Sequence, residues 1–156
     1  MNLEEAQQIT PPMLEQTVIE AIGTNNTEKQ SRFRILMVDD DGCFVNVAAQ
    51  ILASEHNFIV QTANSVDLAL EAISKQAFDA IICDYEMPQK NGLELLRELR
   101  GKKNEIPFVM FTGKGREEVV VTALNLGTDR YVNKHGSPEA VYAELSDAVL
   151  KSIERK

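Results

Sequence analysis

The sequence predicts an α/β fold: a doubly wound, parallel five-stranded sheet with helices on both faces. From Phe33 to the last residue, apolar runs of strand length alternate with amphipathic stretches of helix length. Most of these runs are continuous rather than alternating, which is typical of parallel strands covered on both faces. Right-handed crossovers between such strands place helices on the two sides of one sheet.

The strands are expected at five apolar runs, which are Phe33–Val38, Phe58–Thr62, Ala80–Cys83, Ile106–Phe111 and Arg130–Val132. The five helices between and after them are marked by apolar stripes at a spacing of three or four residues. These stripes begin at Val45, Val66, Leu93, Val119 and Val141.

Three helix ends carry recognisable signals. Asn91 is followed three residues later by Glu94, the spacing of a capping box. Ser137 before Pro138 matches an N-cap with proline at the first helical position. Gly127 stands where the fourth helix should stop, since glycine tolerates the left-handed conformation found there.

Residues 1–32 read as an N-terminal extension, and residues 33–156 as the main domain. The extension holds a short apolar stripe of Leu14, Val18 and Ile22, followed by a polar linker from Thr24 to Ser31. A helix this short is marginal alone in water. The stripe is therefore either loosely ordered or docked on this domain or on a partner.

Composition excludes several classes of protein. The 156 residues suffice for one domain with a core, and the net charge of −8 argues against direct binding to nucleic acid. No apolar run approaches the ~20 residues that span a bilayer, and the N-terminus lacks the basic cluster of a secretory signal. Cys43 and Cys83 have no metal-type spacing and are expected to be buried free thiols, which favours a cytoplasmic location.

Chemistry-bearing residues follow the predicted strands. Asp39, Asp40 and Asp41 come after the first strand, and Asp84, Tyr85 and Glu86 after the third; Thr112 follows the fourth and Lys134 the fifth. Because ligands of such folds sit beyond the carboxyl ends of the strands, these side chains should meet at one edge.

A cluster of carboxylates needs a cation, and oxygen ligands suit Mg²⁺. The metal would keep Asp84 ionised as a nucleophile, while Lys134 and Thr112 would hold phosphoryl oxygens. These are the parts needed for phosphoryl transfer to a carboxylate. The plainer alternative is that the first acidic run only caps a helix and Lys134 only pairs with it.

At these residues the chain resembles the receiver domain of two-component response regulators, of the stand-alone, chemotaxis-regulator-like kind. The stretches that carry the resemblance are Ile35–Asp41, Ile81–Pro88, Asn91-Gly92, Val109–Gly113 and Tyr131–Lys134. The similarity spans about residues 33–153. It implies a strand order of 2-1-3-4-5, which flavodoxin-like folds share.

The resemblance also implies roles at matching positions. Asp84 would be the phosphoacceptor, Asp40 and Asp84 direct Mg²⁺ ligands, and the backbone carbonyl of Glu86 a third ligand. Asp39 would support the metal through water. The remaining assignments are Thr112 and Lys134 as phosphoryl contacts and Tyr131 as the aromatic switch, for which the alternative is a packed strand aromatic.

The sequence departs from the family pattern at two places. Asn91 replaces a frequent aspartate, and Asn-Gly suits the same turn. His135 replaces the proline that usually follows the lysine, where the lysine–proline bond is typically cis. Because a cis bond costs about 2.5–4 kcal/mol without proline, we expect a trans bond, with the loop re-routed around Gly136 and Lys134 still directed at Asp84.

The expected partners are a histidine kinase and a downstream effector or phosphotransfer protein, because no output domain follows the fifth helix. The protein is not expected to be a turnover enzyme. We also expect Lys114 to approach Glu86 across the site.

Three alternatives remain. A haloacid-dehalogenase-like phosphatase would use Asp39 and Asp41 but leave Asp84 without a role. A flavodoxin-type carrier would place a phosphate against the acidic run, which repels it. A receiver-like binding module that works without phosphorylation is the main competitor, although such modules usually lose the acceptor or the lysine.

Overall fold

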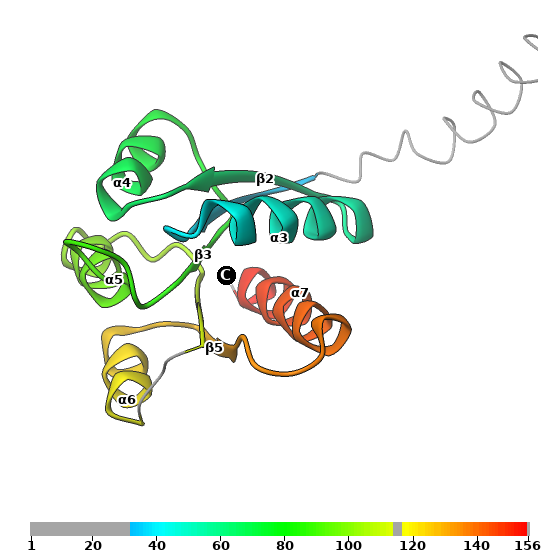
Figure 1. Cartoon of the computed structure of the whole chain (residues 1–156). Coiled ribbons are helices and arrows are strands. Elements are labelled where there is room, and N and C mark those ends of the chain that lie inside the picture. Colours follow the sequence, from blue (N-terminus) through cyan, green and yellow to red (C-terminus); the bar gives the residue numbers. More distant parts are fainter. Residues whose placement is uncertain (1–31, 114–116, 156) are drawn as a thin grey trace, which may run out of the picture. The chain divides into compact units, whose positions relative to one another are not determined.

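A computed structural model describes residues 32–113 and 117–155. Five strands form one parallel sheet in the order β2-β1-β3-β4-β5 (Figure 1). Their bounds are β1 Phe33–Val38, β2 Phe58–Ala63, β3 Ala80–Cys83, β4 Phe108–Thr112 and β5 Arg130–Asn133. The predicted fold class and strand order are confirmed.

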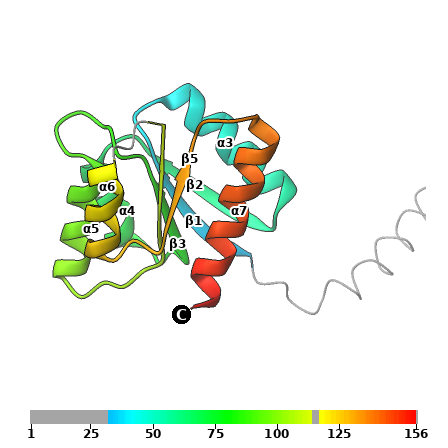
Figure 2. The same cartoon turned by 90° about the horizontal axis from the view of Figure 1, so that it is seen from below.

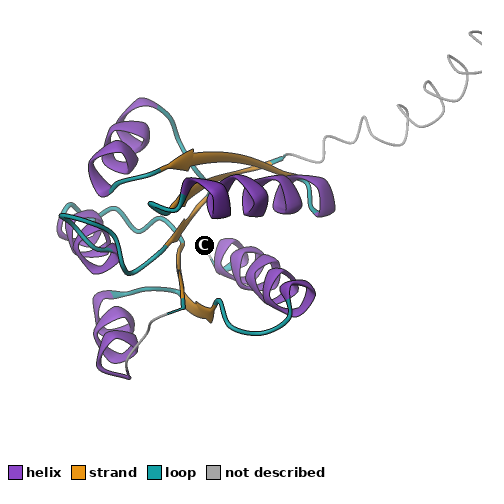
Figure 3. Cartoon of the chain, viewed as in Figure 1, coloured by secondary structure: helices purple, strands orange, loops and turns teal. Residues whose placement is uncertain are grey.

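The helices alternate with the strands along the chain (Figure 3). They are α3 Gly42–Glu55, α4 Val66–Lys75, α5 Gly92–Gly101, α6 Glu117–Leu126 and α7 Pro138–Glu154. Helices α3 and α7 cover one face of the sheet, and α4, α5 and α6 cover the other (Figure 2). This is the doubly wound arrangement that right-handed crossovers produce.

The core has two halves because successive strand residues point to opposite faces of the sheet. On β1, Ile35 and Met37 belong to the cluster under α3 and α7, whereas Leu36 and Val38 belong to the cluster under the other three helices. All four are at most 1% exposed. Burial on both faces explains why this strand reads as an unbroken apolar run.

The predicted helix signals are confirmed. Asn91 and Glu94 form a reciprocal capping box at the start of α5, and the Ser137 hydroxyl accepts a hydrogen bond from the Ala140 amide at the start of α7. Gly127 follows α6 with a φ of +95°.

Strand β4 differs from its predicted bounds. The expected strand began at Ile106, but β4 begins at Phe108 and includes Thr112. Pro107 has no N–H and contributes only its carbonyl, which accepts a hydrogen bond from the Ile81 amide at 2.8 Å. At the other end, Thr112 pairs with Asn133 of β5.

The expectation of two buried thiols is half wrong. Cys83 is buried, but Cys43 is exposed. Helix α3 begins at Gly42, so its core-facing side starts with Val45 and leaves Cys43 in the first turn facing solvent.

Two further predictions concern residues outside the described ranges. The extension, apart from Arg32, lies there, as does Lys114, so its predicted approach to Glu86 stays a prediction. Among the described helices, none combines the length and apolar character that crossing a membrane requires.

Candidate functional site

Four strand ends bring the predicted site residues to one edge of the sheet. Hydrogen bonds between neighbouring strands continue past the ends of β1 and β3: the Asp39 amide donates to the Ala63 carbonyl at 3.0 Å, and the Asp84 amide to the Val38 carbonyl at 2.9 Å. These backbone bonds fix where both aspartates leave the sheet.

The acidic residues divide into two groups. One carboxylate oxygen from each of Asp39, Asp40 and Asp84 lies within 4.8 Å of the others. Asp41 is not in this cluster: its carboxylate caps α3, accepting from the Phe44 amide at 3.1 Å. The helix-cap alternative therefore holds for Asp41, whereas the other three form an all-oxygen group whose spacing fits a small divalent cation.

Lys134 reaches the cluster from the end of β5. Its ammonium lies 2.6 Å from Asp39 Oδ2 and 3.6 Å from Asp84 Oδ2, so the closer ion pair is with Asp39. It also stands 4.4 Å from the centre of the Phe44 ring and 5.5 Å from that of Phe111. Two aromatic faces and two carboxylates thus hold the ammonium in place.

Asp84 lies at the centre of the arrangement and is 9% exposed. Burial raises the pKa of its carboxyl, while a hydrogen bond from the Thr112 side chain and the charge of Lys134 oppose that rise. A cavity of about 340 Å³ opens above these residues. Its lining comprises Asp39, Asp40, Asp41, Asp84, Glu86, Thr112, Gly113 and Lys134.

Three neighbours of the site were not assigned a role from the sequence. Phe44 packs under the ammonium, Gly92 approaches the Asp84 backbone, and the His135 ring contacts Gly113. Gly92 belongs to an Asn-Gly turn signal, but nothing in the local sequence indicates which backbone carbonyl lies against it.

The peptide bond between Lys134 and His135 is trans, as predicted. The described residues contain no cis peptide bond. Gly136 has a φ of +124°, which glycine adopts readily, and therefore takes up the change of direction in the loop. The ammonium remains at Asp39 and Asp84.

Tyr131 lies on β5 beside the site. Burial raises the pKa of its phenol, and the negative charge of Asp84 raises it further. Its hydroxyl is buried and has no hydrogen-bond partner within the described part of the chain. A buried hydroxyl without a partner is costly, so the side chain has a physical reason to adopt another rotamer.

We expect Tyr131→Phe to keep or raise the free energy of unfolding, by up to about 2 kcal/mol, because it removes an unpaired buried hydroxyl. Urea denaturation measures this. Tyr142→Phe is the matched control: that hydroxyl is not among the buried unpaired groups of the described residues, so no gain is expected there. A loss above about 1 kcal/mol in Tyr131→Phe would mean that the hydroxyl has a partner.

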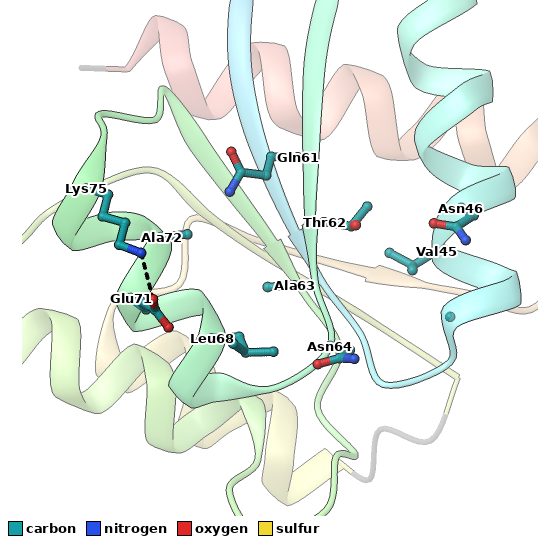
Figure 4. Close-up of a pocket in the computed structure, with 11 residues that line it drawn as sticks. Val45, Asn46, Gln61, Thr62, Ala63, Asn64, Leu68, Glu71, Ala72 and Lys75 are labelled. Atoms are coloured by element: carbon teal, nitrogen blue, oxygen red, sulfur yellow. Dashed lines mark hydrogen bonds and ion pairs between the residues drawn. The ribbon is translucent and has the colours of Figure 1, made fainter.

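A second hollow, of about 460 Å³, lies along β2 between α3 and α4 (Figure 4). Its charged lining residues, Glu71 and Lys75, pair with each other at 2.7 Å across one turn of α4. It contains no cluster of carboxylates, so the chemistry is assigned to the smaller cavity.

Comparisons with known proteins identify related sequences and structures. The family model of the response regulator receiver domain matches residues 35–146. The response regulator SaeR of Staphylococcus aureus strain USA300 is 30% identical over 117 residues, which is 75% of this chain and 50% of SaeR. The chain thus matches about half the length of such relatives.

Solved structures show the same fold. A CheY-like receiver domain protein from Methanospirillum hungatei JF-1 superposes with a TM-score of 0.71 at 28% identity, covering 81% of this chain and all of that one. A receiver domain protein from Clostridium thermocellum gives a TM-score of 0.71 at 25% identity, with coverages of 79% and 95%.

Proposed function

The chain belongs to the response regulator receiver family, and we propose that it is a phosphoacceptor switch of a two-component system. In this proposal Asp84 receives a phosphoryl group from a histidine kinase. The observation that carries it is the cavity in which Asp84 faces two further aspartates, the Thr112 hydroxyl and the Lys134 ammonium.

The residues have distinct roles in the transfer. A carboxylate oxygen of Asp84 attacks the phosphorus, the bond from phosphorus to the kinase histidine breaks, and the imidazole leaves. Lys134 and Thr112 hold the equatorial phosphoryl oxygens, which is where positioning and charge neutralisation matter most. Tyr131 changes rotamer in response and alters the surface that a partner binds.

Asp39, Asp40 and Asp84, with the backbone carbonyl of Glu86, would hold Mg²⁺. The ion supplies positive charge that lets a phosphoryl group approach an acidic cluster. The spacing of the three carboxylates supports this assignment. Asp39 also has Lys134 as a partner at 2.6 Å, which supports its role as an indirect, water-linked ligand.

The switch would act in the cytoplasm through a partner, an effector or a phosphotransfer protein, without binding nucleic acid or membrane itself. The protein would promote its own phosphorylation and dephosphorylation rather than turn over an external substrate. These proposals rest on the family and on the negative net charge of −8.

Acetyl phosphate with Mg²⁺ is expected to add one phosphoryl group to the protein, detected by intact-mass spectrometry. Asp84→Asn should abolish the added mass because the amide is not a nucleophile, and EDTA should stop labelling of the unaltered chain. Asp67→Asn is the matched control, since Asp67 is an exposed residue of α4 paired with Lys90. Labelling of Asp84→Asn at the normal rate would mean that another residue is the acceptor. No labelling of the unaltered protein would favour a binding module that works without phosphorylation.

A further inference from the structure

The loop that carries Lys134 is closed by a turn around that residue. The Asn133 side-chain oxygen accepts a hydrogen bond from the His135 amide at 2.8 Å, and the Lys134 amide donates to the Thr112 carbonyl at 3.2 Å. A proline at position 135 would have no N–H and could not make the first of these bonds. The turn therefore depends on a residue other than proline here.

The His135 side chain adds a second link. Its Nε2 lies 2.6 Å from the Gly113 carbonyl oxygen, which can only accept, so Nε2 carries the proton and donates it. A side chain at position 113 would meet this ring, because a Cβ built there lies 3.8 Å from His135 Cε1 and Nε2. The imidazole thus lies directly against the loop that follows β4.

The hydrogen bond between the His135 ring and Gly113, called the bridge below, joins the residues that directly follow Thr112 and Lys134, the two groups expected to bind the phosphoryl oxygens. Thr112 pairs with Asn133 as the last partners of β4 and β5. One residue further on, the paired strands have ended, and the described links between the loops are the Lys134 amide bond and the His135 ring. Without the ring, the bond from the Lys134 amide is the one described hydrogen bond left between the two segments, and the ammonium keeps its contacts with Asp39 and Asp84.

We propose that His135 is a positioning residue that fixes the Lys134 ammonium relative to Thr112 by fastening the β5–α7 loop to Gly113. The proposal rests on the proposed function, because its consequence is a faster phosphoryl transfer to Asp84. Where a proline would shape this loop through its ring, this chain uses two hydrogen bonds from one histidine. His135 is exposed, and the competing interpretation is a plain solvent-facing loop residue.

The size of the effect distinguishes the two interpretations. A single exposed hydrogen bond contributes only about 1 kcal/mol to the free energy of unfolding. A displacement of ~1 Å at a reacting group can slow a reaction by about a hundredfold. Loss of the ring should therefore change the labelling rate far more than it changes stability.

The test compares His135→Ala, His135→Gln and the control His56→Gln, with acetyl phosphate and Mg²⁺. His135→Ala is expected to lower the labelling rate of Asp84 about tenfold, with the thermal midpoint lowered by no more than about 5 °C. The glutamine carboxamide can donate to the same carbonyl, so His135→Gln should recover most of the rate. His56 stacks on Phe58, the first residue of β2, with ring centroids 5.5 Å apart, whereas the site lies at the carboxyl ends of the strands, so its variant should label normally.

Two results would overturn the proposal. His135→Ala labelling at the unaltered rate would remove the positioning role. Equal slowing in His135→Gln and His135→Ala would mean that the donated hydrogen bond is not what matters.

Nitrogen-15 NMR of the imidazoles tests the hydrogen bond from His135 without any phosphorylation, so it can fail or succeed independently of the proposed function. The chain has two histidines, so His56→Gln assigns the His135 ring. The proposal expects a ring that carries a proton on Nε2, and shifts of the Lys134 and Gly113 amides in His135→Ala that His135→Gln reverses. If the unaltered protein is not labelled but these signals behave as expected, the proposed function fails and the bridge stands. A ring protonated only at Nδ1, or unmoved amides, would refute the bridge.

Discussion

Gly92→Ala is expected to lower the free energy of unfolding by about 3 kcal/mol and to slow labelling of Asp84 at least about a hundredfold. A Cβ at position 92 would overlap the Asp84 carbonyl oxygen and lie 3.2 Å from its carbonyl carbon. These are backbone atoms, so the clash cannot be relieved by rotating a side chain. The new carbon would also stand 3.1 Å from Sδ of Met110, which is fully buried.

The clash should act on the site rather than only on packing. Gly92 is the first residue of α5, and its amide donates to the Tyr85 carbonyl at 3.0 Å, which holds the helix start against the loop after β3. To make room, either α5 must move outward or the backbone of Asp84 must move. The second change displaces the Asp84 carboxylate directly, and the first pulls on the loop after β3 through the hydrogen bond between Gly92 and Tyr85.

Gly101→Ala is the matched control within the same helix. Gly101 ends α5, and a Cβ built there meets nothing within 4 Å. Alanine should leave labelling unchanged and raise the free energy of unfolding by up to about 1 kcal/mol, because it restricts the unfolded chain. Urea denaturation and intact-mass labelling measure both variants. Normal stability together with normal labelling in Gly92→Ala would show that the helix start can shift without disturbing Asp84.

The sequence was sufficient for the parts of the fold that local patterns determine. Strands β1 and β3 have the predicted bounds because both are buried on two faces and read as unbroken apolar runs. The start of strand β4 was predicted two residues too early, because the apolar pattern includes Ile106 and Pro107. The residue pairs between β3 and β4 begin at Phe108. Hydrogen-bonding capacity, not hydropathy, decided that boundary.

The sequence predicted which residues meet at the site, because that follows from the order of the strands. It did not predict the contacts that each side chain makes there. Asp84 and Lys134 could be placed together because the carboxyl ends of parallel strands share one edge. The division between Asp41, which caps α3, and Asp39, which pairs with Lys134, could not be seen from three consecutive aspartates. It depends on the backbone angles at the start of α3, which residue type alone does not fix.

Lys134→Met is expected to have the second large effect. Asp39 and Asp84 are 2% and 9% exposed, and the ammonium at 2.6 Å and 3.6 Å is their described basic partner. Removing one member of a buried ion pair costs about 3–5 kcal/mol because it leaves charge without compensation. We therefore expect a loss of that order in EDTA, measured by urea denaturation, and labelling slowed by at least about a hundredfold because the proposed phosphoryl contact is gone.

Lys75→Met is the control for the substitution itself. Lys75 also makes an ion pair at 2.7 Å, with Glu71, but its side chain is 70% exposed. Exposed pairs contribute about 0–1 kcal/mol, so this variant should keep nearly full stability and the normal labelling rate. Equal losses in the two lysine variants would contradict the assignment of Lys134 to a buried charged site.

The stability of Lys134→Met should depend on Mg²⁺ and on pH in a way that a packing defect would not produce. The ammonium pairs with the same carboxylates that would hold Mg²⁺. Its removal should therefore strengthen Mg²⁺ binding and let added Mg²⁺ restore more stability than in the unaltered protein.

In EDTA, loss of the lysine charge should move the already raised pKa of Asp84 further upward. A raised folded-state pKa means that the folded state binds more protons, so stability should fall as the pH rises through that pKa. Two results together would show that Lys134 does not neutralise the acidic cluster. One is a stability of Lys134→Met in EDTA that does not change with pH. The other is a gain in stability from Mg²⁺ no larger than that of the unaltered chain.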